Sequence, residues 1–338
     1  MKILHTSDWH LGHTLYNYDR TVEQQAFLRQ LTRIVTEEQP DAMVVSGDIY
    51  HYSSPAAATQ KMYTDAMLNI HQACPEMTIV VTAGNHDSSS KLEIDSNLWQ
   101  HFGLNVVGNI ERTAEEVNLD KHIIEINNEK KTKGYVIAVP HVYPQNFPLL
   151  DTETPRDQRQ ARFFQALLDE VKKRNTAQLP VVLMAHLSIE GSDRSGHDES
   201  IGGIEYVPLS AMGEGYDYLA LGHIHCPQDI KGSHHHARYC GTPLPVSFDE
   251  TYPHSVSIIE LEKGAEPQIS TREIENPIPL VTLPHDPTPF EDALKLLEEY
   301  PEEKPAYLRL NVLTKGYLPP DCNEKASNAA KGKACKYC

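Results

Sequence analysis

The sequence lacks any apolar stretch long enough to cross a bilayer, although its hydrophobic fraction of 40% is ordinary for a globular protein. This absence argues against an integral membrane protein. The start of the chain also lacks the apolar core of a secretory signal, because the short run of Ile3 and Leu4 is broken by His5 and Asp8. We therefore expect a soluble, cytoplasmic protein with no membrane partner.

Cysteine is too sparse for a disulfide framework. The chain has six cysteines among 338 residues, whereas small disulfide-stabilised secreted domains use far more per residue. Cys335 and Cys338 have CxxC spacing, but no second pair stands at zinc-site distance and no thioredoxin-like pattern surrounds them. A reducing compartment fits this usage best, and we expect no cysteine chemistry.

Positive charge is also scarce. The sequence has 30 Lys and Arg against 47 Asp and Glu, a formal net charge of −17. A protein that binds nucleic acid through a broad basic surface needs many Lys and Arg side chains to neutralise the phosphates. Such a surface is therefore not expected here. Bound divalent cations or a basic partner subunit would offset part of the charge. The GxxxxGK[ST] phosphate loop is absent too, so any ATP dependence must come from a partner.

From residue 1 to about 275, short apolar runs alternate with amphipathic stretches, which is typical of a layered α/β or sandwich domain. Amphipathic helices are expected over residues 24–35 and 59–71, and the second is also a candidate dimer face. The expected strands cover residues 2–6, 42–46, 78–82, 135–139, 181–185, 218–221 and 256–261.

A change of composition after about residue 275 indicates a second unit. Five prolines between Pro277 and Pro289 mark the boundary. Strands are then expected over residues 280–283 and 307–313, and helices over 290–300 and 322–330. We therefore divide the chain into a domain of residues 1–275 and a small C-terminal α/β domain of residues 276–338.

Oxygen and imidazole donors follow five of the expected strands. In open α/β sheets, sites form outside the carboxyl ends of the strands, so donors from five strand ends can converge on one place. These donors are Asp8, His10, Asp48, Asn85, His186, His223 and His225.

The chemistry of these donors favours a pair of divalent ions. Two Asp, one Asn and four His without a thiolate suit Mn²⁺, Fe²⁺ or Zn²⁺ better than Ca²⁺ or copper. Seven ligands are too many for one ion, but they suffice for two if one carboxylate bridges. Two ions about 3.5–4 Å apart clamp the attacking and leaving oxygens of an in-line displacement. The pattern therefore predicts phosphate ester hydrolysis.

Each motif alone also has a plain structural explanation. An Asp-x-His after a strand is more often a helix N-cap with a surface histidine, and Gly-Asp commonly forms a turn. The single His186 is a weak signal. The segment Gly84-Asn-His-Asp is harder to dismiss, because its His-Asp pair can form an oriented imidazole. The order of the motifs and their common place at strand ends favour a site.

The series Asp8-x-His10, Gly47-Asp48, Gly84-Asn-His-Asp, His186 and Gly222-His-x-His225 resembles that of the calcineurin-like metallophosphoesterases. Further segments resemble, more narrowly, the nuclease subunits of bacterial SbcCD complexes: Thr6-Ser-Asp-Trp-His-Leu-Gly12, Ser46-Gly-Asp-Ile-Tyr50 and Gly241-Thr-Pro-Leu-Pro-Val-Ser-Phe248. The resemblance implies a layered β-sandwich flanked by helices, with a C-terminal capping domain. It also implies a DNA exonuclease and endonuclease that acts in repair and recombination.

The resemblance also assigns roles to single residues. One metal takes Asp8, His10 and His225, the other takes Asn85, His186 and His223, and Asp48 bridges them. The ions are expected to be Mn²⁺, with Fe²⁺, Zn²⁺ or Mg²⁺ as alternatives. Three further residues have catalytic assignments. His86 stabilises or protonates the leaving oxygen, and Asp87 orients the His86 imidazole. His51 stands where some relatives carry a phosphate-facing histidine.

The resemblance further implies partners. We expect an SbcC-type ATPase partner, DNA, and a homodimer assembled through apolar helices in residues 59–103. Relatives usually continue beyond the point that corresponds to Cys338, so we expect a chain truncated within elements that contact the ATPase. Two alternatives stay open: a phosphoesterase of the same superfamily acting on small phosphodiesters or phosphoproteins, and a non-catalytic scaffold that binds a partner through the helix at 59–71.

Overall fold

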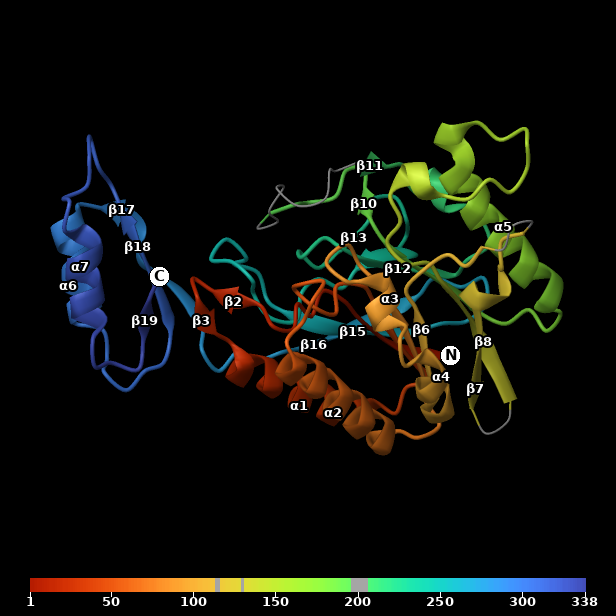
Figure 1. Cartoon of the computed structure of the whole chain (residues 1–338), viewed down its shortest axis with the longest axis horizontal. Helices are drawn as coiled ribbons and strands as arrows, with labels where there is room; N and C mark the ends of the chain where they lie inside the picture. The colour runs from red at the N-terminus through yellow and green to blue at the C-terminus, as the bar shows by residue number, and fades with distance from the viewer. Residues whose placement is uncertain (113–115, 129–130, 196–205) are drawn as a thin grey trace.

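The computed structural model describes residues 1–112, 116–128, 131–195 and 206–338. Its main body consists of two six-stranded sheets packed face to face, with helices on the outer faces (Figure 1). This is the layered sandwich with flanking helices that the sequence predicts. Within the described part of the chain, no helix is both long and apolar enough to span a bilayer.

The first sheet has the order β16-β15-β1-β4-β5-β6. Its strands β1, β4, β5 and β6 run parallel to one another. On the other side of β1, β15 pairs antiparallel with β1, and β16 pairs antiparallel with β15. Neither β6 nor β16 is expected from the sequence, because β6 has only four residues and β16 exposes most of its side chains at the sheet edge. The strands are β1 (Lys2–Thr6), β4 (Ala42–Ser46), β5 (Thr78–Thr82), β6 (Leu104–Val107), β15 (Ser255–Glu260) and β16 (Gln268–Glu273).

The second sheet has the order β13-β14-β12-β9-β8-β7. Its four central strands are parallel, and the two edge strands pair antiparallel with their neighbours. The strands are β7 (Ile123–Asn128), β8 (Lys131–Ala138), β9 (Val181–His186), β12 (Tyr218–Gly222), β13 (Gln228–Asp229) and β14 (Ala237–Tyr239). Short pairings complete the main body: β2 (Thr14–Leu15) with β3 (Tyr18–Asp19), and β10 (Ser188–Ile189) with β11 (Tyr206–Val207).

The space between the sheets is filled by alternate side chains of their strands. In β4, Val44 faces the second sheet and shares a core with Val182 and Met184, while Met43 and Val45 face the helices on the other side. A strand buried on both faces needs an unbroken apolar sequence, which is why the β4 run is easily identified. The result is a rigid platform whose strand ends are fixed relative to each other.

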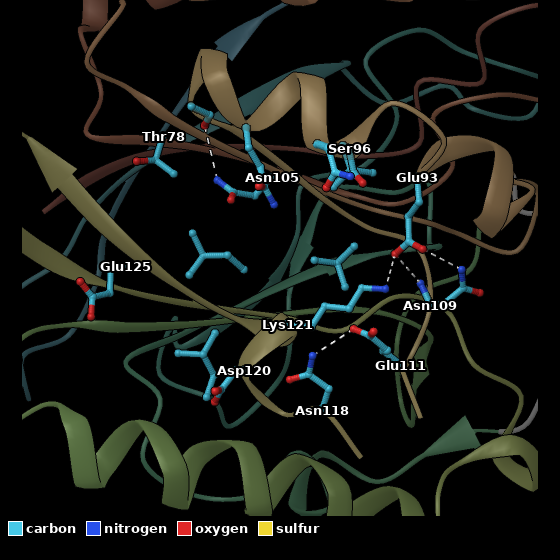
Figure 2. A pocket seen from close by; sticks show the side chains of 17 residues that line it. Thr78, Glu93, Ser96, Asn105, Asn109, Glu111, Asn118, Asp120, Lys121 and Glu125 are labelled. Atoms are coloured by element: carbon cyan, nitrogen blue, oxygen red, sulfur yellow. Dashed lines mark hydrogen bonds and ion pairs between the residues drawn. The ribbon is translucent and has the colours of Figure 1, made fainter. Parts of the chain in front are cut away.

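The edges of the two sheets at β6 and β7 border a polar pocket of about 860 Å³ (Figure 2). Within it, the Lys121 amino group lies 2.7 Å from the Glu93 carboxylate, which also accepts the backbone N–H groups of Gly108 and Asn109. None of the predicted site residues lines this pocket. The predicted chemistry therefore lies elsewhere, at the strand ends.

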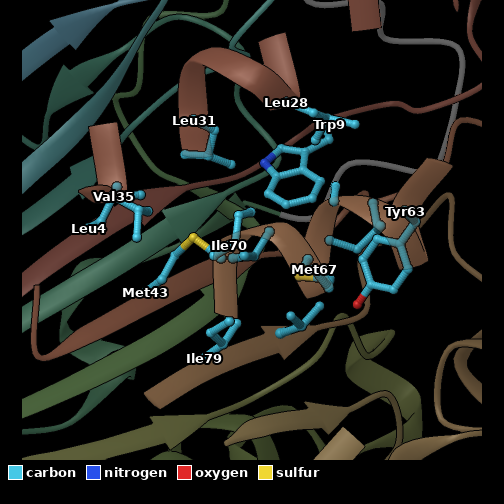
Figure 3. Packing of buried hydrophobic residues seen from close by; sticks show 14 of the residues in the cluster. Leu4, Trp9, Leu28, Leu31, Val35, Met43, Tyr63, Met67, Ile70 and Ile79 are labelled. Carbon is cyan, nitrogen blue, oxygen red and sulfur yellow. The ribbon is translucent and has the colours of Figure 1, made fainter. Parts of the chain in front are cut away.

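The outer face of the first sheet is covered by α1 (Thr21–Glu38) and α2 (Ala57–Ala73), which extend the two helices expected from the sequence. Leu31 of α1 and Ile70 of α2 are fully buried against sheet residues such as Met43, and Trp9 packs between the helices and the sheet (Figure 3). The second sheet is covered by α5 (Arg159–Arg174). Two short helices, α3 (Ser89–Leu92) and α4 (Ser96–Trp99), follow the loop after β5.

Residues from Leu280 onward form a separate three-stranded sheet with two helices, seen at one end of the molecule in Figure 1. Their apolar side chains form their own cluster, which includes Leu294, Leu297 and Leu308. Tyr307 joins this unit to Leu15 and Phe248 of the main body. The division at residue 275 stays a prediction. The elements are β17 (Leu280–Thr288), α6 (Phe290–Glu298), β18 (Tyr307–Val312), α7 (Cys322–Ala330) and β19 (Lys336–Tyr337).

Candidate metal centre

The carboxyl ends of five strands, with the loops that follow them, bring the seven predicted donors together. Strands β1, β4 and β5 of the first sheet run parallel, so their carboxyl ends lie at the same edge, and β9 and β12 are parallel in the second sheet. The two edges meet where the His186 Nδ1–H donates to the Ser46 carbonyl at 2.8 Å. Donors that are up to 217 residues apart in sequence, from Asp8 to His225, thus surround one point.

Four of the donors have backbone torsions that ordinary residues rarely adopt. The φ angles are 54° at Asp8, 45° at His10, 52° at Asp48 and 98° at His223. Left-handed backbone at non-glycine residues costs of order 1–3 kcal/mol each and persists where the surroundings fix it. Here hydrogen bonds from the Asp8 and His10 amides to the carbonyls of Gly47 and Asp48 fix these turns. The strained turns point the donor side chains inward.

Glycines next to the donors permit this close approach. A side-chain carbon on Gly222 would lie 1.8 Å from the Ser46 carbonyl oxygen, and one on Gly84 would lie 2.1 Å from Oδ1 of Asp48. Both distances are far inside van der Waals contact. The glycines of the Gly-His-x-His and Gly-Asn-His-Asp motifs are therefore packing requirements of the centre as well as turn residues.

Asp8, His10 and His225 form one group of donors. Their ligand atoms all lie within 4.8 Å of one another, and the Nε2 atoms of His10 and His225 are 3.3 Å apart. All three side chains are buried. Imidazole nitrogens that face each other in a buried site fit a cation held between them.

Asn85, His186 and His223 form a second group. The Asn85 Oδ1 atom lies 3.0 Å from Nε2 of His186 and 3.0 Å from Nδ1 of His223. Asp48 lies between the groups, with its Oδ2 3.4 Å from Nε2 of His186 and 3.9 Å from Nε2 of His10. Asp48 thus approaches a histidine of each group, and Asp8 also lies within ligand distance of Asp48 and His186.

Burial and mutual attraction set the charges of these donor side chains. Burial acts to lower the pKa of His186, but the adjacent Asp48 carboxylate outweighs it and raises that pKa to about 9. The same attraction holds the pKa of Asp48 well below its usual value, although burial acts in the opposite direction. Burial lowers the pKa of His10 well below normal. His186 and Asp48 therefore favour a buried ion pair, whereas burial favours the neutral form of His10.

A buried carboxylate that sequence reasoning missed orients His225. The His225 Nδ1–H donates to Oε1 of Glu250 at 2.8 Å, and the Thr242 hydroxyl donates to the other oxygen of Glu250 at 2.9 Å. With Nδ1 engaged, Nε2 of His225 is the nitrogen that faces Asp8 and His10. Glu250 lies in a loop just after the segment ending at Phe248, and its residue type alone gives no signal of this role.

The three residues predicted to be catalytic lie beside the donors. His86 is half-buried, and its Nδ1–H donates to the His51 carbonyl at 2.9 Å. The His51 Nδ1 lies 3.4 Å from Nδ1 of His10, and burial together with His86 lowers the pKa of His51 to about 4. The Asp87 carboxylate accepts the backbone N–H groups of Ile49, Tyr50 and Gly84. The group that holds the His86 imidazole is thus the His51 carbonyl.

His141 is a further histidine at the centre that the sequence did not single out. It follows β8, which gives it the same strand-end position as the donors, but an isolated histidine is a weak signal. Its Nδ1–H donates to the His186 carbonyl at 3.2 Å, and its ring centre lies 6.0 Å from that of His186. It therefore supports the His186 side of the centre.

Residues 1–227 match the model of the calcineurin-like phosphoesterase family. The matched stretch contains all seven donors and the three neighbouring residues His51, His86 and Asp87. The chain belongs to the calcineurin-like phosphoesterase family.

Known relatives narrow the relationship to the SbcD nucleases of that family, which are components of SbcCD. The chain is 33% identical over 309 residues to the SbcD nuclease of Rhodobacter capsulatus, covering 88% of this chain and 75% of the relative. The SbcD nuclease of Escherichia coli K12 is 29% identical over 330 residues, which are 94% of this chain and 79% of that protein. The SbcD nuclease of Bacillus subtilis is 31% identical over 277 residues, which are 79% of this chain and 68% of that protein.

Members of the calcineurin-like family act through a dimetal centre, and the donor set of this chain fits one. Candidate ligand groups lie side by side, and they include Asp8 with His10 and His225 and Asp8 with Asp48 and His186. The chain is accordingly a phosphodiester-hydrolysing enzyme of this phosphoesterase family.

Replacing Glu250 with glutamine is expected to weaken Mn²⁺ binding by about 10-fold or more, because partners of metal-ligating histidines contribute about 10- to 100-fold to affinity. Glutamine keeps the shape of the side chain but removes the charge that polarises the His225 imidazole. Calorimetric titration with Mn²⁺ measures the change. Asp249→Asn, at the exposed neighbouring position, is the matched control and should bind as tightly as the wild type. Equal affinity of Glu250→Gln and wild type would contradict the role of Glu250.

Proposed function

We propose that this chain is a two-metal DNA nuclease that serves as the SbcD component of an SbcCD-type complex in DNA repair and recombination. The observation that carries the proposal is the convergence of seven donors from five strand ends on one buried centre, with the half-buried His86 beside it. The relatives are named as nucleases, which supports a nucleic-acid phosphodiester as the substrate.

We assign Asp8, His10 and His225 to one ion, and Asn85, His186 and His223 to the other. The 3.3 Å separation of the His10 and His225 nitrogens supports the first group, and the two 3.0 Å contacts of the Asn85 oxygen support the second. Asp48 bridges the two ions, since its Oδ2 lies within 4 Å of a histidine from each group.

We propose that the ions are Mn²⁺, with Fe²⁺, Zn²⁺ and Mg²⁺ as the metals to compare. Imidazole and carboxylate donors without a thiolate suit Mn²⁺ and Fe²⁺, and they also suit Zn²⁺. When bound, such a pair of ions supplies a nucleophile at neutral pH and neutralises charge on the phosphate oxygens.

His86 is proposed to act on the leaving oxygen. Its Nδ1 donates to a backbone carbonyl, which can only accept, so Nδ1 keeps its proton and Nε2 is the nitrogen that exchanges one. Its ring stands 4.9 Å from that of His10, close enough to the centre to reach a bound phosphate ester. A proton from Nε2 to the departing oxygen would complete the cleavage.

His51 and Asp87 are proposed to act through position. The His51 carbonyl holds His86, and its ring stacks on that of His86 with centres 5.2 Å apart. Asp87 ties the loop after β4 to the loop after β5, because its carboxylate accepts N–H groups from both. Asp48 and Asn85 belong to these two loops, so Asp87 sets the spacing of two proposed ligands.

Residues 276–338 are proposed to form the capping domain. Their separate apolar cluster supports this boundary, and Tyr307 and Arg309 join them to the main body beside Phe248. The names of the relatives also support an SbcC subunit as the partner. An ATPase in that subunit would be the source of any ATP dependence. DNA would then be shared between the two proteins.

A homodimer through residues 59–103 is proposed as well. Ile94 lies in the turn between α3 and α4, Leu98 lies on α4, and 78% and 57% of their surfaces are exposed. Large apolar side chains exposed together favour association with a second surface. A dimer would place two metal centres against one DNA substrate.

The wild-type chain is expected to cleave linear duplex or hairpin DNA with Mn²⁺, because the proposed donors activate attack on a phosphodiester. Cleavage of these DNAs and of a small chromogenic phosphodiester is measured side by side, with each candidate metal and with or without ATP. The rate should not change with ATP, since the sequence lacks a phosphate loop. Hydrolysis of the small diester without any cleavage of DNA would contradict the nuclease assignment.

Two variants serve as controls for this assay. His86→Ala should lose turnover by about 10²- to 10⁴-fold, the usual contribution of a general acid, and should still bind Mn²⁺ in a calorimetric titration. Asp48→Ala should lose both turnover and metal binding. Loss of Mn²⁺ binding in His86→Ala would show that His86 is a ligand.

Sedimentation is expected to show a dimer that weakens when the exposed apolar pair carries charge. Ile94→Asp combined with Leu98→Asp should shift the chain toward monomer, because a buried unpaired carboxylate opposes association. Leu149→Asp, at a similarly exposed leucine outside residues 59–103, should leave the dimer unchanged. A wild-type chain that stays monomeric at high concentration would contradict this interface.

A further inference from the structure

Two exposed tyrosines stand near the candidate metal centre, one beside each donor group. Tyr52 is 53% exposed and Tyr143 is 42% exposed, whereas the donors between them are buried or half-buried. Each tyrosine makes an edge contact with a histidine that in turn touches a proposed metal ligand. They therefore lie at the exposed rim of the centre.

Tyr52 lies on the side of the first donor group. Its ring centre is 4.6 Å from that of His51, at an interplanar angle of 79°. His51 in turn contacts His10 through the 3.4 Å approach of their Nδ1 atoms. The edge contact holds the tyrosine ring while about half of its surface faces solvent.

Tyr143 lies on the side of the second donor group. Its ring centre is 5.0 Å from that of His141, at an interplanar angle of 82°. His141 donates to the carbonyl of His186, a proposed ligand. The geometry thus repeats that of Tyr52: an exposed ring, an intervening histidine and a metal-binding histidine.

The chemistry of this rim fits nucleobases. Tyrosine rings stack on any base, and such stacking does not depend on a broad basic surface, which is not expected for a chain of net charge −17. A cation lies at the same rim, because the Lys91 amino group is 2.6 Å from the hydroxyl of Ser54, two residues beyond Tyr52. Aromatic rings together with a lysine are the combination that binds single-stranded nucleic acid.

We propose that Tyr52 and Tyr143 are stacking platforms for the two unpaired bases that flank the scissile phosphate. This inference rests on the proposed nuclease function and extends it, because it makes an unpaired stretch of strand the form of DNA that the centre accepts. A base stacked on Tyr52 and a base stacked on Tyr143 would hold the phosphate between them over the donors. Duplex DNA would have to open at its end before cleavage.

The test compares ring removal with ring retention at each position. Tyr52→Ala and Tyr143→Ala should each raise KM for a short single-stranded oligonucleotide by roughly 10-fold, with little change in kcat, since base–aromatic stacking has about this effect. Tyr52→Phe and Tyr143→Phe should stay near wild type, because phenylalanine keeps the ring. Tyr317→Ala, at a fully exposed tyrosine of the C-terminal unit, is the matched control and should change nothing.

A change of substrate tests the same contacts from the side of the DNA. An oligonucleotide with abasic sites on both sides of its central phosphodiester should bind weakly, and the alanine variants should weaken its binding no further. Binding is measured by fluorescence anisotropy with Mn²⁺ in the His86→Ala background, so that no cleavage intervenes.

The outcomes separate this inference from the function on which it rests. Wild-type cleavage with unchanged KM in both alanine variants would overturn the platforms and leave the nuclease assignment standing. Equal losses on normal and abasic strands would also overturn them. A wild-type chain that cleaves neither oligonucleotide would contradict the nuclease assignment and the platforms together.

Discussion

The contact between the carboxyl ends of the two sheets is the constraint on which the whole centre depends. At this contact the His186 imidazole donates to the Ser46 carbonyl at 2.8 Å, and Gly222 packs where no side chain would fit. Asp48 follows Ser46 by two residues and His223 follows Gly222 directly, so this contact sets the distance between donors of the first sheet and donors of the second. The sandwich core holds the contact rigid, because the strands behind it are buried on both faces.

A centre this rich in buried titratable groups is destabilising unless each group is compensated. Among the side chains this compensation comes in pairs: Asp48 with His186, and Glu250 with His225. The strained turns at Asp8, His10, Asp48 and His223 add a further cost, as is usual where a fold holds side chains ready for function. Two cations bound among these donors would balance the charge of the carboxylates, and the free energy of metal binding would offset part of this loss of stability.

The donors are easy to find in the sequence because each follows a strand with a distinct apolar run. The bounds of β1, β4 and β5 agree with the expected ones for the same reason: parallel strands buried on both faces leave little ambiguity. Edge strands such as β16 were missed because solvent-facing side chains interrupt the apolar pattern.

Residues outside the strand ends were harder to foresee. Glu250 reaches His225 across a loop, and no periodic pattern encodes such a contact. Asp87 was expected to orient His86 because the two are adjacent, but its carboxylate turns to three backbone N–H groups instead. Which partner such a side chain takes depends on the loop torsions, and residue types alone do not determine them.

The most direct test of this account is to count and place the ions. Crystals soaked in Mn²⁺ and measured at an anomalous wavelength should show two peaks about 3.5–4 Å apart, one on each side of the Asp48 carboxylate. The first should contact Asp8, His10 and His225, and the second should contact Asn85, His186 and His223. A single peak, or two peaks without Asp48 between them, would contradict the bridging role on which the proposed chemistry depends.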